Sequence, residues 1–254
     1  MLRRRINTIT FLIFFSVVSI ILFPLACLLW ITTVLFDKRL IAQHLFTQFW
    51  GSLYFWTIPR WRVKFNGRKK ISNQKACVLV ANHRSLMDIV VLSGMFRHFK
   101  WVSRAEIFRV PFMGWNMTMN RYISLKRGDK KSIIKMMKDC EHAIKSGSSV
   151  LLFPEGTRSE DGELRRFLPG AFSLAKRMKV PIIPIVLNGT GEALPKNTFL
   201  LNGKCKITID VLDEIPYESF SNKLPEEISV EIRNLFAQHV KEHQEVVKKK
   251  LIST

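Results

Sequence analysis

The stretch SVLLFPEGTRSEDGELRRFLPGAFSLAKRMKVPIIPIVLN, residues 149–188, contains two β-rich runs on either side of a helical segment. The first run covers residues 149–153 and leads into a polar loop. Pro169 and Gly170 then open a helical segment that continues to residue 179. The second run covers residues 182–188. A strand, a helix and a second strand in this order predict two parallel strands of one sheet.

The alternation of strands and helices continues on both sides of this stretch. A further helical segment covers residues 129–146, and apolar residues at helical spacing predict a C-terminal helix over residues 225–250. We therefore predict an α/β domain over residues 61–254, with a largely parallel sheet of about seven strands flanked by helices. In such sheets, active sites form in the loops that leave the strand ends. The β-rich runs lie at residues 61–66, 77–81, 99–104, 121–126, 149–153, 182–188 and 206–212.

The uncharged residues 6–36 are too apolar for a helix buried in a soluble domain, and they predict a membrane-anchoring helical segment within residues 1–40. As one helix they would be about 46 Å long, whereas the hydrocarbon core of a bilayer is about 30 Å thick. The anchor is therefore either transmembrane and strongly tilted, or re-entrant. Because Pro24 removes a helix hydrogen bond, we expect two shorter helices that enter the bilayer and return to the same side.

Residues 41–60 are rich in aromatic side chains, among them Trp50, Tyr54 and Trp56. Amphipathic aromatic residues prefer the headgroup region of a bilayer, so we predict an interfacial helix here. The alternative is a core helix of the following domain.

The net charge of +20, from 40 Lys and Arg against 20 Asp and Glu, indicates a polyanionic partner or a solubilising surface. The partner classes are nucleic acid, an anionic membrane and phosphorylated substrates. The sequence has no signature of a recognition helix, an RNA-binding fold or a zinc finger, so we expect no nucleic acid. The four cysteines are far apart and predict neither a disulfide framework nor a metal site: Cys27, Cys77, Cys140 and Cys205.

The first chemically informative motif is NHRSLMD at residues 82–88, directly after a predicted strand. Histidine is the side chain best suited to accept a proton near neutral pH, and a carboxylate partner fixes its tautomer. His83 in the loop and Asp88 in the first helical turn would form such a pair. The alternative is that Ser85 and Asp88 form only a capping box that begins the helix.

The second motif is FPEGTRS at residues 153–159, which also follows a predicted strand. A glycine-containing loop with an arginine and two hydroxyl groups suits a phosphate. Arg158 supplies a bidentate fork, and the backbone amides beside Gly156 are open. This motif therefore predicts a phosphate-binding loop.

The two motifs in this order resemble the 1-acylglycerol-3-phosphate acyltransferase family of glycerolipid acyltransferases over residues 60–215. Residues 122–127 and 180–184 resemble two weaker blocks of the family, and Arg127 matches a phosphate-binding arginine. The chain departs from the family pattern at Arg104, Arg121 and Lys126, which leaves the choice of acceptor open.

The resemblance implies that residues 61–254 transfer a fatty acyl group to the sn-2 hydroxyl of lysophosphatidic acid, giving phosphatidic acid. The implied co-substrate is acyl-CoA or an acyl-carrier protein, with no cofactor and no metal. Alternative acceptors are glycerol-3-phosphate, another lysophospholipid and lyso-ornithine lipid. The implied partners are membrane lipids, and the implied location is a bacterial inner membrane with the domain on its cytoplasmic side. His83 and Asp88 are then catalytic, and the substrate-binding residues are Arg127, Glu155, Gly156, Thr157 and Arg158.

Overall fold

The computed structural model describes residues 2–58, 61–158, 163–195, 198, 200–202 and 204–252. Its centre is a seven-stranded sheet in the order β1-β7-β6-β2-β5-β3-β4, which confirms the predicted α/β fold. Five of the six neighbouring strand pairs are parallel, and only β6 and β7 are antiparallel. The strands are β1 (Trp61–Asn66), β2 (Val78–Ala81), β3 (Phe99–Arg104), β4 (Ile123–Leu125), β5 (Ser149–Leu152), β6 (Ile182–Asn188) and β7 (Cys205–Val211).

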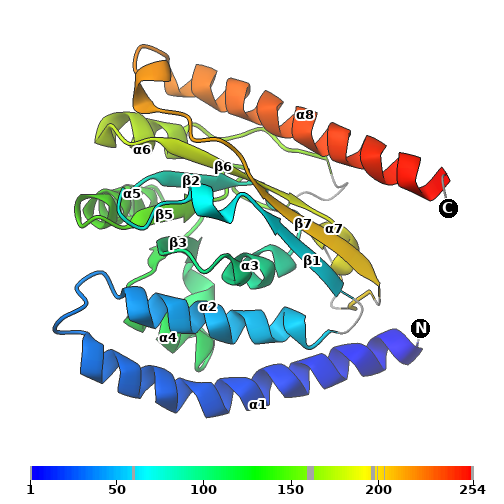
Figure 1. Cartoon of the computed structure of the whole chain (residues 1–254). Helices are drawn as coiled ribbons and strands as arrows, with labels where there is room; N and C mark the ends of the chain where they lie inside the picture. The colour runs from blue at the N-terminus through cyan, green and yellow to red at the C-terminus, as the bar shows by residue number, and fades with distance from the viewer. Residues whose placement is uncertain are drawn as a thin grey trace.

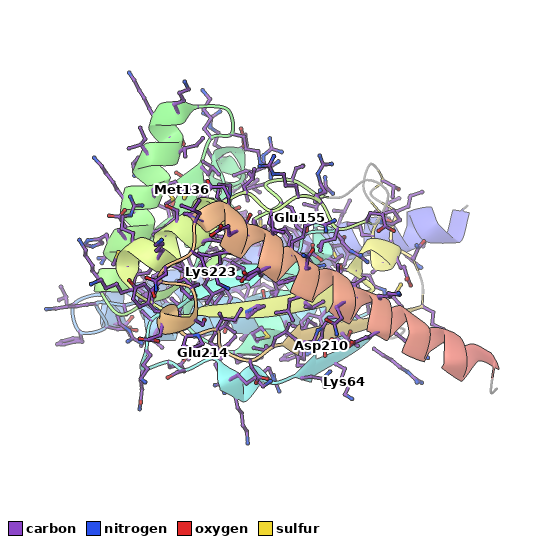
Figure 2. The ribbon with its side chains drawn as sticks, turned by 90° about the horizontal axis from the view of Figure 1, so that it is seen from above. Lys64, Met136, Glu155, Asp210, Glu214 and Lys223 are labelled. Carbon is purple, nitrogen blue, oxygen red and sulfur yellow. The ribbon has the colours of Figure 1, made fainter. Side chains whose placement is uncertain are left out.

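Helices cover both faces of this sheet (Figure 1). The apolar side chains of β2 alternate between two cores: Leu79 packs toward the side of α2 and α3, and Val78 and Val80 pack toward α5, α6 and α8. Because both faces are buried, the central strands are continuous apolar runs. Seen from above, α8 crosses the sheet (Figure 2). The helices over the domain are α3 (Met87–Leu92), α4 (Met113–Met119), α5 (Lys130–Lys145), α6 (Gly170–Met178), α7 (Thr190–Ala193) and α8 (Pro225–Ile252), and the short 3-10 helices are η1 (Arg68–Lys70), η2 (Ser93–Met95), η3 (Ala105–Arg109) and η4 (Tyr217–Ser219).

The N-terminal segment is one continuous helix, α1 (Leu2–Thr33), with Pro24 inside it. The expectation of two helices broken at Pro24 is therefore wrong. A proline inside a helix costs about 3 kcal/mol, but here the residues beside it are packed. The ring of Phe23 contacts those of Phe112 and Trp115, and Ala26 is fully buried. This packing offsets the lost hydrogen bond and keeps the helix intact.

Among the described residues, the part of α1 from Ile6 to Thr33 is the one helix that is long and apolar enough to cross a membrane. Only 11% of an apolar 18-residue stretch of this helix is buried within the protein. Its exposed side chains include Leu12, Ile20 and Ile31. Apart from a narrow contact stripe, α1 therefore presents apolar side chains outward.

Residues 41–60 contribute α2 (Ile41–Trp56), which lies between α1 and the domain (Figure 1). Trp50 and Tyr54 are buried against α1, whereas Trp56 is exposed. The domain side of α2 is polar. His44 Nδ1 lies 2.7 Å from the hydroxyl of Tyr122, and Gln43 donates to Asn116 Oδ1 at 3.1 Å. Hydrogen bonds as well as apolar packing therefore join α2 to the domain.

Candidate active site

The two motifs follow neighbouring strands. β2 and β5 are parallel, with Val80 opposite Leu152, so the loops that leave their carboxyl ends lie side by side. Asn82 continues β2 by one residue: its side chain donates to Leu187 O at 2.9 Å and accepts from Leu187 N at 2.7 Å. This pair of bonds imitates a strand pairing with β6 and fixes where the chain turns. His83 is the next residue.

His83 and Asp88 form the predicted pair, with 2.8 Å between His83 Nδ1 and Asp88 Oδ2. The same carboxylate oxygen accepts from the backbone N–H groups of Arg84 and Ser85, at 2.7 and 2.9 Å. Asp88 is fully buried. The helix-starting bonds and the contact with His83, which the sequence offered as alternatives, are therefore both present. The bonds that begin α3 also hold the carboxylate in place against the imidazole.

The pairing of His83 leaves one ring nitrogen for chemistry. With Nδ1–H donated to Asp88, Nε2 carries the lone pair, and it has no hydrogen-bond partner among the residues that the structure describes. A side chain in this state accepts a proton from a hydroxyl group.

Glu155 forms hydrogen bonds with the loop that carries this pair. Its Oε1 accepts from the backbone N–H of His83 at 2.8 Å, and its Oε2 accepts from that of Arg165 at 3.1 Å. Burial raises the pKa of the Glu155 carboxyl, and the two backbone donors oppose that shift. The side chain is 5% exposed. Glu155 was predicted to bind the acceptor, but in this structure both of its oxygens already bind the protein.

Phe153 contacts the site, although the sequence prediction gave it no role. Its ring stacks on the imidazole of His83, with 4.2 Å between centroids and 22° between planes, and Trp101 continues the stack beyond it. The only sequence signal was its place as the first residue of the second motif. The alternation of residues within each strand could not reveal that Phe153 contacts His83, because the two are 70 residues apart in sequence.

The glycine of the second motif makes a tight turn. Gly156 has φ of 68°, and its N–H donates to Phe153 O at 3.0 Å. A β-carbon there would lie 3.1 Å from Leu168 Cδ1. Thr157 and Arg158 follow, both half-buried, and Ser159 lies outside the described residues.

Three arginines come together from separate parts of the chain. Partial desolvation lowers the pKa of Arg127, and the nearby guanidinium groups of Arg104 and Arg158 lower it further, while Glu106 raises it. Glu106 pairs with Arg104 at 3.3 Å. Positive charges that interact electrostatically in this way favour the binding of an anion near Arg127. Arg104, on β3, was noted in the sequence only as a departure from the family pattern.

Among the described residues, no group of three His, Cys, Asp or Glu side chains could hold a metal ion. Burial raises the pKa of the Cys77 thiol to about 11 and that of Cys140 to about 12, so neither supplies a thiolate near neutral pH.

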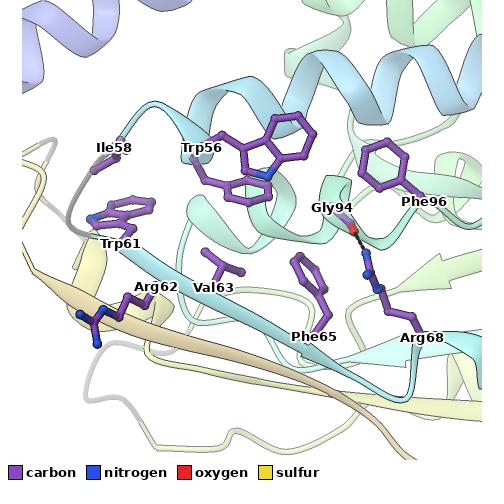
Figure 3. A pocket seen from close by; sticks show the side chains of 10 residues that line it. Trp56, Ile58, Trp61, Arg62, Val63, Phe65, Arg68, Gly94 and Phe96 are labelled. Carbon is purple, nitrogen blue, oxygen red and sulfur yellow. Dashed lines mark hydrogen bonds between the residues drawn. The ribbon is translucent and has the colours of Figure 1, made fainter.

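A separate cavity of about 650 Å³ lies between α2, β1 and η2 (Figure 3). Arg68 crosses one end, where it donates to Gly94 O at 2.9 Å and lies over the ring of Phe65. The residues that line this cavity include neither a general base nor a nucleophile, so it offers no group that could take a proton from a hydroxyl. The lining residues are Phe55, Trp56, Ile58, Trp61, Arg62, Val63, Phe65, Arg68, Gly94 and Phe96.

Known proteins resemble this domain in both fold and sequence. The chain resembles the crystal structure of the 1-acyl-sn-glycerophosphate (LPA) acyltransferase PlsC from Thermotoga maritima, with a TM-score of 0.76 and 22% identity over 96% of this chain and 98% of that one. At this identity the likeness shows the fold alone.

Two curated relatives are 1-acyl-sn-glycerol-3-phosphate acyltransferases. A chloroplastic protein of Brassica napus is 35% identical over 82% of this chain and 61% of its own length, and a protein of Chlamydomonas reinhardtii is 32% identical over 88% and 71%. The chain thus spans about three-fifths of the Brassica protein. The family model described as Acyltransferase matches residues 62–188, which contain both motif loops and the paired His83 and Asp88. The chain belongs to the acyltransferase family.

Proposed function

We propose that this protein transfers a fatty acyl group from a thioester to the sn-2 hydroxyl of lysophosphatidic acid, giving phosphatidic acid. The observation that supports this most is the buried His83–Asp88 pair, in the loop after β2. Arg158 follows the neighbouring parallel strand β5 and interacts electrostatically with Arg127. Such a site combines a general base for a hydroxyl group with a binding place for a phosphate. Both named relatives are acyltransferases for this acceptor.

The reaction needs one proton acceptor and no acyl-enzyme. His83 Nε2 takes the proton of the acceptor hydroxyl, while Asp88 stabilises the imidazolium that forms. The hydroxyl oxygen attacks the thioester carbonyl, the C–S bond breaks, and the leaving thiolate takes the proton from the imidazolium. The raised pKa values of Cys77 and Cys140 agree with direct transfer.

The acceptor is held by its phosphate. Arg158 and Arg127 bind the phosphate oxygens, Arg104 adds a third charge, and the turn at Gly156 and Thr157 contributes backbone amides. Glycerol-3-phosphate, another lysophospholipid and lyso-ornithine lipid remain the alternative acceptors.

The exposed apolar surface of α1 supports attachment to a membrane, where the acceptor and the product reside. We place the enzyme at a bacterial inner membrane with its domain on the cytoplasmic side, where acyl-CoA and acyl-carrier protein are available. No cofactor is required.

Thiol release tests this function directly. The purified protein in detergent is supplied with acyl-CoA or acyl-carrier protein, with and without lysophosphatidic acid, beside its His83→Ala variant. We expect release that requires the acceptor and falls by about 10²–10⁴-fold in the variant. Full activity of a folded His83→Ala protein would refute the proposed base. Silence with both donors and all four acceptor classes would refute the proposed function.

A further inference from the structure

The cavity between α2, β1 and η2 is lined mostly by apolar side chains, with arginines at its ends. Its volume of about 650 Å³ falls within the range of roughly 300–1,000 Å³ that is usual for small-molecule sites in proteins. Figure 3 shows the rings of Trp56, Phe65 and Phe96 around it, with Arg62 and Arg68 at opposite ends. The lining contains no Asp or Glu. Such a cavity suits a ligand with a long apolar part and a negative charge.

Arg68 is held in place but keeps donors for a ligand. Its Nη1 donates to Gly94 O at 2.9 Å, and its guanidinium carbon lies 4.9 Å from the centroid of the Phe65 ring. Among the described residues, its Nε and Nη2 have no hydrogen-bond partner, and no acid lies within salt-bridge distance of it. A guanidinium with two nitrogens open binds a carboxylate through two parallel hydrogen bonds. Arg68 therefore offers a preorganised site for a carboxylate.

Arg62 is less suited to hold a charged group inside the cavity. Successive side chains of a strand point to opposite faces of the sheet. Val63 and Phe65 pack against the core on the side of α2, whereas Arg62 and Lys64 are exposed. Arg62 therefore starts from the opposite face of β1. The charged end of a ligand is expected at Arg68.

The Arg68 end of the cavity lies away from the motif loops. β1 is parallel to β7, β7 is antiparallel to β6, and β6 is parallel to β2. β1 therefore runs opposite to β2. Arg68 follows the end of β1 and His83 follows the end of β2, so the two residues lie at opposite edges of the sheet. A ligand with its charge at Arg68 therefore occupies a site distinct from the proposed acyl-transfer site.

The exposed side of α2 connects the cavity with the surface near α1. Trp56 lines the cavity and is 53% exposed. Its ring stacks on Phe96, with 6.2 Å between centroids, and contacts the exposed ring of Phe49. Tryptophan prefers the headgroup region of a bilayer, and α1, with its exposed apolar surface, forms the layer beyond α2 (Figure 1). An amphiphile dissolved in the bilayer can therefore enter beside Trp56.

We propose that this cavity binds the anion of a long-chain fatty acid. The acyl chain lies among the aromatic rings between α2 and β1, and the carboxylate binds Arg68. A single chain suits a cavity of small-molecule size, and a carboxylate matches the two open nitrogens of Arg68. Because the site is separate from the proposed acyl-transfer site, it does not depend on which acceptor the enzyme uses.

Photo-crosslinking locates such a ligand. The full chain in lipid nanodiscs is titrated with palmitic acid that carries a diazirine on its chain, or with the methyl ester of this probe, and labelled peptides are identified by mass spectrometry. We expect the acid to label the last turn of α2, β1 and η2. Arg68→Gln should weaken the apparent affinity of the acid there by roughly 10- to 100-fold and leave labelling by the ester unchanged. Arg62→Gln removes the same charge from the other end and should change neither.

Two further variants test the cavity and its separation from the proposed acyl-transfer site. Val63→Trp should reduce labelling by both probes, because the larger ring fills the space of the chain. Arg158→Ala should keep the labelling, since Arg158 belongs to the proposed phosphate site. The comparison of acid with ester in Arg68→Gln stands alone if Val63→Trp folds poorly.

Several results would overturn the assignment. One is labelling confined to α1, which would show only probe dissolved in the bilayer. Another is loss of labelling by the acid in Arg158→Ala or in Arg62→Gln. An equal loss of acid and ester labelling in Arg68→Gln would show that Arg68 only shapes the cavity, and unchanged labelling by the acid in that variant would exclude it as the carboxylate site.

Discussion

The backbone N–H of His83 donates a 2.8 Å hydrogen bond to Oε1 of Glu155, across 72 residues of sequence. This bond joins the loop that carries the proposed general base to the loop that carries the proposed phosphate-binding residues. The other carboxylate oxygen accepts from the backbone N–H of Arg165. We therefore predict that Glu155 acts mainly by positioning His83.

We therefore expect Glu155→Gln to lower kcat and leave the KM for the acceptor unchanged. The amide keeps one acceptor oxygen but turns an N–H group toward a backbone donor, which costs about 1–3 kcal/mol. Steady-state kinetics and chemical denaturation would measure both effects, with the exposed Glu218→Gln as the control. A changed KM with an unchanged kcat would return Glu155 to the acceptor-binding residues.

Replacing the ring that stacks on His83 should reduce the rate of the chemical step. Phe153→Leu keeps an apolar side chain but removes the aromatic face that holds the imidazole plane. Such stacking contributes about 0.5–1.5 kcal/mol, so we expect a loss of roughly 2- to 10-fold in kcat. Phe153→Tyr retains the ring and should restore most of the rate. If leucine and tyrosine behaved alike, the stack would have no catalytic role.

Removal of one arginine from the cluster should weaken binding of the acceptor. A charge-assisted hydrogen bond contributes about 1.5–3 kcal/mol, so Arg158→Ala should raise the KM for lysophosphatidic acid by roughly 10- to 100-fold. Arg177→Ala removes the same charge from the α5–α6 contact, where Arg177 binds Glu141, and should leave that KM unchanged. The arginine cluster would not be the phosphate site if the two variants had the same KM.

A buried histidine makes the folded state sensitive to acid. Burial, with repulsion from Lys100 and Arg39, lowers the pKa of His98 from 6.5 to about 3. The folded state keeps His98 neutral, whereas the unfolded chain binds a proton below pH 6.5. The unfolded state therefore binds more protons, and the unfolding free energy falls as the pH drops from 6.5 toward 3.

Between pH 7 and pH 5 this difference amounts to about 2 kcal/mol. His98→Gln retains a donor for Ser148, which His98 Nε2 contacts at 3.0 Å, but it does not titrate. Denaturation in mild detergent at both pH values should therefore show a smaller loss in the variant. Equal losses in both proteins would exclude His98 as the source.

Local sequence determined most of the architecture. Both faces of the central strands are buried, so their apolar runs were visible without knowledge of their partners. The predicted bounds of β1, β3 and β6 match the structure residue by residue. The pairing of His83 with Asp88 was also predictable, because the two residues are five apart and a helix start fixes their geometry.

Only the tertiary structure decided the relations between distant segments. Trp61 of β1 lies opposite Cys205 of β7, and no periodicity within either run encodes that partner. Long-range packing also kept α1 continuous through Pro24, against its local preference. The hydrogen bond from His83 to Glu155 and the electrostatic interaction of Arg104 with Arg127 depend on segments that the sheet brings together. The periodicity of apolar side chains and the backbone preferences of single residues depend on a few neighbours in sequence. Burial and electrostatic interactions instead depend on which residues the fold places next to one another.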